Sequence, residues 1–98
     1  MKKTTIYDCT IQVQYFDGCG VQVSTTTLTP GSVDIEITDS NTCSVMGIEN
    51  LGLLSWRDED MILADKECTV RIIIRKSSIQ ETADLLDRLL GGESYWIN

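Results

Sequence analysis

Apolar residues alternate with polar residues along most of this chain, and this alternation constrains the fold more than any other feature. Successive side chains of a β-strand point to opposite faces, so a period of two indicates a strand with one buried face and one exposed face. The segments with this pattern are residues 7–15, 19–26, 33–38, 43–45 and 68–75, with a further short strand expected at 61–64. The sequence therefore predicts an antiparallel sheet.

The connection between the first two expected strands is predicted from their shared parity, because both have apolar residues at odd positions. A two-residue turn would bring opposite faces of the two strands together. A three-residue loop at 16–18 instead pairs Tyr15 with Cys19 and keeps both apolar faces on one side. We expect this loop, with Gly18 in the left-handed conformation of a type I turn with a bulge.

One helix is expected near the end of the chain. Ser78 and Glu81 have the spacing of an N-terminal capping box, and Gly91 stands where a helix often ends. The apolar residues between them form a helical stripe: Ile79, Ala83, Leu86 and Leu90. We expect residues 94–98 to dock against the domain, because three of them are large and apolar or aromatic.

These elements predict a single α+β domain over residues 1–98. We expect an antiparallel β-sheet of five to six strands with one C-terminal α-helix packed on its apolar face. Such a sheet is about 25 Å wide, whereas a helix is about 10 Å wide, so the helix covers two or three strands. The remaining area either curls into a half-barrel or is covered by another chain. A homodimer is thus one of two expected arrangements.

The charges are distributed unevenly along the sequence. Residues 4–56 contain six carboxylates and no Lys or Arg, and the whole chain has a net charge of −7. These six residues are Asp8, Asp17, Asp34, Glu36, Asp39 and Glu49. A surface of one sign attracts basic partners and repels polyanions, so we expect no direct binding of nucleic acid or of an anionic membrane.

The compartment is predicted from the beginning of the chain. Lys2 and Lys3 are followed by polar residues and not by the apolar segment of a secretory signal, so we expect a cytoplasmic protein. Cysteines stay reduced in that compartment. All four cysteines share the parity of the apolar residues in their expected strands and are predicted to be buried free thiols: Cys9, Cys19, Cys43 and Cys68.

The sequence predicts no catalytic residues, no metal site and no cofactor. The chain has no His, and a nucleophilic cysteine needs a base or a positive field, which the cation-free segment lacks. Asp34 and Glu36 are expected side by side in water on the outer face of one strand. The acidic residues 58–60 lack the spacing of a calcium-binding loop. We therefore expect that the protein is not an enzyme.

A binding protein is the leading hypothesis. We expect a stoichiometric inhibitor of a basic protein, such as a nuclease or another nucleic-acid-binding protein, whose carboxylates take the place of phosphates. Phage-encoded inhibitors of host defence, anti-CRISPR proteins among them, and the immunity proteins of nuclease toxins share this size and charge. The residues expected to bind the partner, with the tryptophan as the aromatic anchor, are Asp34, Glu36, Glu49, Trp56, Asp58, Glu59 and Asp60.

The alternative hypothesis is a structural or assembly module, such as a phage virion or accessory protein. In that case the uncovered sheet face is a subunit contact and the acidity serves only solubility. Salt separates the two hypotheses, because it screens attraction between charged surfaces and has little effect on an apolar contact.

Overall fold

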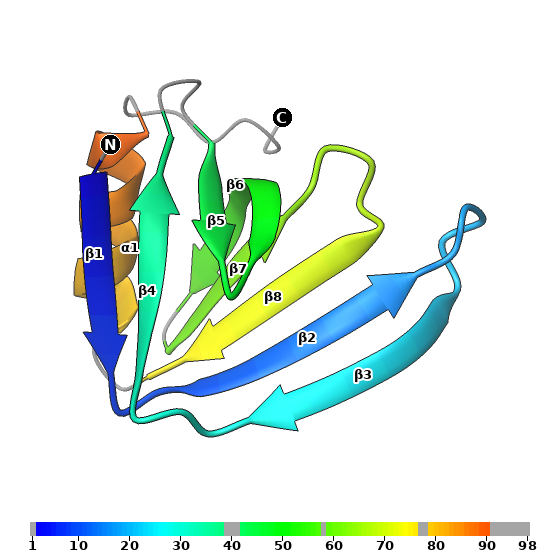
Figure 1. The fold of residues 1–98 in the computed structure, drawn as a ribbon, viewed down its shortest axis with the longest axis horizontal. Coiled ribbons are helices and arrows are strands. Elements are labelled where there is room, and N and C mark those ends of the chain that lie inside the picture. Colours follow the sequence, from blue (N-terminus) through cyan, green and yellow to red (C-terminus); the bar gives the residue numbers. More distant parts are fainter. Residues whose placement is uncertain (1, 39–41, 58, 77–78, 91–98) are drawn as a thin grey trace.

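The computed structural model describes residues 2–38, 42–57, 59–76 and 79–90. These residues form an α+β fold with one antiparallel sheet of eight strands and one C-terminal helix (Figure 1). The elements are β1 (Lys2–Tyr7), β2 (Thr10–Phe16), β3 (Gln22–Leu28), β4 (Ser32–Ile37), β5 (Cys43–Val45), β6 (Ile48–Arg57), β7 (Asp60–Ala64), β8 (Val70–Arg75) and α1 (Ile79–Leu89).

The strand order across the sheet is β1-β4-β5-β6-β7-β8-β2-β3, and all neighbours are antiparallel. The sheet is neither closed nor curled, so the expected half-barrel is wrong. The expected number of five to six strands is also wrong, because β1 was not anticipated and β6 did not look like one strand. β1 is mostly polar, and β6 contains Asn50 and Gly52, which disfavour a strand.

The strand predicted at 7–15 is divided by a corner that separates β1 from β2. Asp8 at this corner has a φ of 54°, in the left-handed region. Ile6 and Cys9 on its two sides are both buried, although their separation of three residues would place them on opposite faces of one regular strand. The corner therefore reverses the parity of the buried positions, and it sends β1 and β2 to opposite ends of the strand order.

Four of the expected strands are confirmed, with the expected positions buried. They correspond to β4, β5, β7 and β8; burial alternates regularly in β4, β5 and β8, whereas Leu63 and Ala64 of β7 are both buried, and Cys68 lies before β8 and is only half-buried. The helix is confirmed too: the stripe of Ile79, Ala83, Leu86 and Leu90 is buried, and α1 contacts β6 and β7. The capping residue Ser78, Gly91 and the segment 94–98 lie outside the described residues. No helix in the described part of the chain is long and apolar enough to cross a membrane.

The register predicted for the β2–β3 hairpin is wrong. Tyr15 lies opposite Ser24 and not opposite Cys19, so the loop is longer than three residues. The left-handed glycine of this loop is Gly20, with a φ of 83°, and not Gly18. As a consequence, Val23 faces outward and not towards the core as expected, and every residue of β3, the last strand of the sheet, is exposed.

The loop between β2 and β3 is organised by the side chain of Asp17. Its Oδ1 accepts hydrogen bonds from the backbone N–H groups of Cys19 (2.8 Å) and Val21 (2.9 Å). The N–H of Asp17 also donates to the carbonyl of Val21 (2.9 Å). A carboxylate that satisfies backbone donors in this way stabilises a turn, and it fixes the loop at a length that strand parity alone cannot indicate.

The inner face of the sheet is buried within one chain from β4 to the beginning of β2. Ile35 of β4 and Ile11 of β2 are both fully buried and belong to one hydrophobic cluster with α1, although they come from opposite parts of the strand order. Figure 1 shows that β1 and β4 run at a steep angle to β2 and β3. The part of the inner face between these two residues is therefore not open to a second chain, and its area does not support a homodimer.

The four cysteines are free, but only two of them are buried. Cys9 and Cys43 belong to the core as expected, and burial raises the pKa of the Cys43 thiol to about 12 and also raises that of Cys9. Cys19 is exposed and Cys68 is half-buried. The expectation is wrong for these two because they lie in the turns before β3 and β8, where parity does not apply.

The exposure of the cysteines predicts their order of reaction with a thiol reagent. Cys19 should react first, Cys68 more slowly, and Cys9 and Cys43 only after unfolding, because a thiol reagent must reach the sulfur and because burial raises the pKa of the Cys9 and Cys43 thiols. Mass spectrometry of the native protein during alkylation measures this order, and Cys19→Ser should remove the fast phase. Rapid alkylation of Cys43 in the folded protein would contradict the burial described above.

Candidate functional site

Two of the predicted site residues lie on the outer face of β4. The alternation of this strand buries Ile35 and exposes Asp34 and Glu36 on either side of it. β5 pairs with β4 so that Ser44 lies opposite Glu36. The same alternation that forms the core thus presents two carboxylates to solvent, two residues apart and about 7 Å from one another along the strand.

A hollow lies on the outer side of β4, β5 and β6 and has a volume of about 450 Å³. It is lined by Ser32, Val33, Asp34, Glu36, Ser44, Met46, Gly47 and Glu49. We call it the acidic hollow. It brings together three of the predicted partner-binding residues, Asp34, Glu36 and Glu49, although the last of these comes from a segment that was not recognised as a strand. The charged residues of its lining are all carboxylates.

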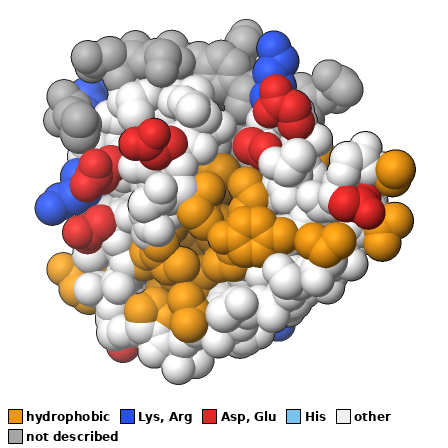
Figure 2. Space-filling view, turned by 45° about the vertical axis from the view of Figure 1, so that its right-hand side comes forward, with side chains coloured by type: hydrophobic (Ala, Val, Ile, Leu, Met, Phe, Trp, Pro, Cys, Tyr) orange, Lys and Arg blue, Asp and Glu red, His pale blue; other side chains and the backbone are white. Residues whose placement is uncertain are grey.

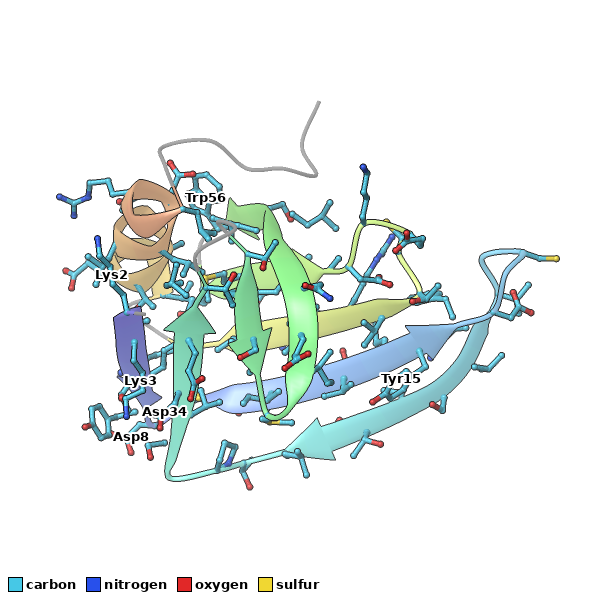
Figure 3. The ribbon with its side chains drawn as sticks, turned by 45° about the horizontal axis from the view of Figure 1, so that its top comes forward. Lys2, Lys3, Asp8, Tyr15, Asp34 and Trp56 are labelled. Carbon is cyan, nitrogen blue, oxygen red and sulfur yellow. The ribbon has the colours of Figure 1, made fainter. Side chains whose placement is uncertain are left out.

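Lys3 approaches the acidic hollow, which the sequence did not indicate. The β1–β4 register places Lys3 opposite Glu36, and its Nζ lies 3.8 Å from Oδ2 of Asp34 (Figure 3). Thr5 donates a hydrogen bond of 2.7 Å to the other carboxylate oxygen of Asp34. Both partners of the Lys3–Asp34 ion pair are about half-exposed, so the pair contributes little to the stability of the fold. A cationic side chain of another protein that binds Asp34 more tightly could therefore replace Lys3.

The turn at the rim of the acidic hollow has an unusual residue. Val45 lies opposite Ile48, so β5 and β6 are joined by the two residues Met46 and Gly47. Their φ angles are 53° and 81°, and a two-residue turn with two positive φ angles favours Asn-Gly. Met46 is unfavourable there, and its side chain is 43% exposed. The two-residue spacing between alternating strands was a signal for this turn that the sequence reading missed.

Three of the remaining predicted residues, Trp56, Glu59 and Asp60, belong to the β6–β7 hairpin and do not line the hollow. Asp60 is paired with Arg75, whose Nε lies 2.6 Å from Oδ1 and whose terminal nitrogen lies 3.0 Å from Oδ2. This hydrogen-bonded guanidinium lowers the pKa of the Asp60 carboxyl. Glu59 is exposed, and its carbonyl accepts the N–H of Lys76 (2.9 Å). Asp58 lies outside the described residues.

Trp56, the expected anchor, also lies away from the acidic hollow. It is opposite Met61 on β7, and its half-buried ring packs against the hydrophobic core. In Figure 3 it lies near α1, well separated from Asp34 and Lys3. This packing against the core explains why an aromatic ring stands at this position, and no partner protein is needed to explain it.

The chemistry available in the acidic hollow is that of carboxylates and hydroxyl groups. Its lining offers acceptors for the N–H groups of Arg and Lys side chains, and carboxylates form the stronger, charge-assisted kind of hydrogen bond with them. Within the described residues, no group of three or more His, Cys, Asp or Glu side chains is arranged to hold a metal ion. The arrangement is therefore suited to recognising cationic side chains.

Replacement of Met46 tests the strain at the rim of the hollow. Met46→Asn creates the preferred Asn-Gly turn and should raise the free energy of unfolding by about 0.5–1 kcal/mol, measured by denaturant titration. Gly47→Ala is the matched control and should lower it by about 1 kcal/mol, because a Cβ there meets no atom within 4 Å but is strained at a φ of 81°. A destabilised Met46→Asn protein would show that the methionine side chain packs more than its exposure implies.

The Asp60–Arg75 pair predicts a dependence of stability on pH. The pKa of Asp60 is lower in the folded protein than its ordinary value of 3.8, so the pair stabilises the fold above that value. The contribution is lost as the pH falls through the lower, folded pKa. An NMR titration of the Asp60 carboxyl should show this pKa rising towards the ordinary value in Arg75→Gln, and an unchanged titration would contradict the pairing.

No protein-family model matches the chain, no curated protein matches it, and no solved structure matches it.

Proposed function

We propose that this protein is a small, non-catalytic inhibitor that binds a basic protein through the acidic hollow. The observation that carries the proposal is the convergence of Asp34, Glu36 and Glu49 on one space of about 450 Å³. The partner supplies Arg or Lys side chains, which make charge-assisted hydrogen bonds to these carboxylates. Proteins that bind nucleic acid expose such side chains to phosphates, so a nuclease or a related protein is the favoured partner.

The acidic hollow supports competition for part of a phosphate-binding surface. Asp34 and Glu36 are about 7 Å apart along β4, whereas one strand of DNA has a negative charge every 3.4 Å or so along its axis. The linear density of charge on β4 is thus about half that of one DNA strand. Glu49 adds a third carboxylate from β6. We therefore infer contact with a few cationic side chains of the partner and not with its whole nucleic-acid footprint.

The half-exposed Met46 would add an apolar contact at the rim of the hollow. A residue held in an unfavourable conformation commonly has a role outside local stability, because sequence selection would otherwise replace it. An exposed methionine adapts its shape to a partner surface. We therefore expect Met46→Asn to make the fold more stable and to make dissociation from the partner faster.

The assembly-module hypothesis stays a prediction. The inner sheet face that it used as a subunit contact is buried in the single chain, from Ile35 to Ile11. Such a module would therefore need another contact surface. The acidic hollow does not favour an obligate apolar contact, because its charged lining residues would have to be desolvated.

The experiment compares two variants that remove the same number of charges. The hollow variant is Asp34→Asn, Glu36→Gln and Glu49→Gln, and the control variant is Glu59→Gln, Glu67→Gln and Glu81→Gln. In the first step, the wild-type protein is used as bait to capture basic proteins from a lysate of nuclease-rich cells. In the second step, surface plasmon resonance measures the rate at which each variant associates with a captured protein at several salt concentrations. We expect the hollow variant to associate at least tenfold more slowly and with a weaker salt dependence.

The control variant separates the hollow from general acidity. It should associate almost as fast as the wild type, whereas Lys3→Gln should associate faster because a competing cation is removed from Asp34. If the association rate fell equally in the two triple variants, the binding would depend on net charge alone and not on the hollow. Unchanged binding by the hollow variant would refute the proposal.

A further inference from the structure

The two edges of the sheet are protected very differently. β1 and β3 are the two edge strands of the sheet formed by the described residues. An exposed edge has unpaired N–H and C=O groups, and charged residues, lysine above all, commonly prevent it from pairing with another chain. β1 has two exposed lysines, Lys2 and Lys3. β3 has no charged residue at all.

β3 has the properties of a strand that pairs with another chain. All seven of its residues are exposed, and its sequence, QVSTTTL, is rich in β-branched residues and contains no proline. A register irregularity opposite Tyr15 and Phe16 lies at the loop end of β3, so residues 24–28 follow β2 regularly. Among the described strands, β3 pairs only with β2, so no described strand lies on its other side.

Exposed hydrophobic side chains accompany this edge on both sides of the sheet. Leu28, opposite Ile11, is 39% exposed, and Tyr15 on the same face of β2 is 42% exposed. Val23 is 61% exposed. Figure 2 shows hydrophobic surface in the middle of the face that it views, with acidic side chains to its left, above it and to its right. A strand added to β3 would cover part of Val23 and Leu28 in addition to forming backbone hydrogen bonds.

The distribution of charge indicates which chain covers the edge. Two copies of a protein with a net charge of −7 repel one another, so they can meet only where charges are few. Residues 18–33, which contain all of β3, have no charged side chain. A basic partner would find no carboxylate in this segment to attract it. A second copy of the chain would find no carboxylate there to repel it.

We infer that β3 pairs with β3 of a second copy, in antiparallel orientation, to form one continuous sheet across two chains. A two-fold axis at Thr26 places the run Thr25–Thr27 opposite the same run of the second copy, and threonine pairs across strands are favourable. Residues on one face of the sheet stay on that face across the axis. The contact is small, so we expect a dimer with a dissociation constant in the micromolar range.

Sedimentation velocity over a range of concentrations tests this pairing. The variants Thr26→Lys and Thr25→Lys place the protective lysine on the two faces of the edge, and both residues are exposed, so the monomer should keep its fold. Leu85→Lys makes the same change of net charge on α1 at a side chain that is 40% exposed. We expect each threonine variant to weaken dimerisation at least tenfold and Leu85→Lys to leave it unchanged.

Hydrogen exchange locates the contact. The amide protons of β3 should exchange more slowly as the concentration rises, whereas those of β1 should not change. Added salt should leave the dimer unchanged or strengthen it, because salt screens repulsion between the two acidic chains. The binding of a basic partner by the acidic hollow should weaken instead, so each proposal can fail without the other.

Three results would overturn the inference. The first is a monomer at every concentration measured. The second is a dimer that survives both threonine variants, which would place the contact elsewhere. The third is full protection of the β3 amides at the lowest concentration, because the edge would then be covered within a single chain.

Discussion

The corner between β1 and β2 is the constraint on which the rest of the fold depends. Asp8 adopts a left-handed conformation there, its N–H donates to the carbonyl of Gly31 (3.3 Å), and Nζ of Lys76 donates to the carbonyl of Tyr7 (2.6 Å). These bonds join the beginning of β4 and the end of β8 to the corner. Two strands that follow one another in the chain thereby serve opposite ends of the sheet, and both ends contribute to one core.

The position of the acidic hollow follows from that core. Each strand that buries its inner residues must present its intervening residues to solvent, so burial of Ile35 fixes the exposure of Asp34 and Glu36. The short β5–β6 turn then brings Glu49 beside them and leaves Met46 at the rim. Carboxylates on neighbouring paired strands are held in place more firmly than carboxylates on loops, which favours recognition of a defined surface.

The parts of the fold that could be predicted are those indicated by a pattern within one segment of the chain. The parts that depend on contacts within a loop or between distant segments could not be predicted. β4, β5, β8 and the stripe of α1 were recognised because alternation and helical periodicity are local patterns, and β7 was expected from a short apolar run. The β2–β3 register was missed because Asp17 accepts hydrogen bonds from within the loop, so the loop is longer than parity suggested. β1 was missed because it is mostly polar and exposed, and it forms a strand by pairing with β4, which lies about 30 residues further along the chain.

For the candidate site, the sequence by itself determined that Asp34 and Glu36 face solvent on one strand and that the protein is strongly acidic. Only the tertiary structure decided which carboxylates act together. Pairing of β4, β5 and β6 groups Glu49 with them, the β1–β4 register brings Lys3 to Asp34, and pairing of β7 with β8 joins Asp60 to Arg75. The physical reason is that charge and strand parity are properties of single segments, whereas the partners of a charged group depend on which strands the fold makes neighbours.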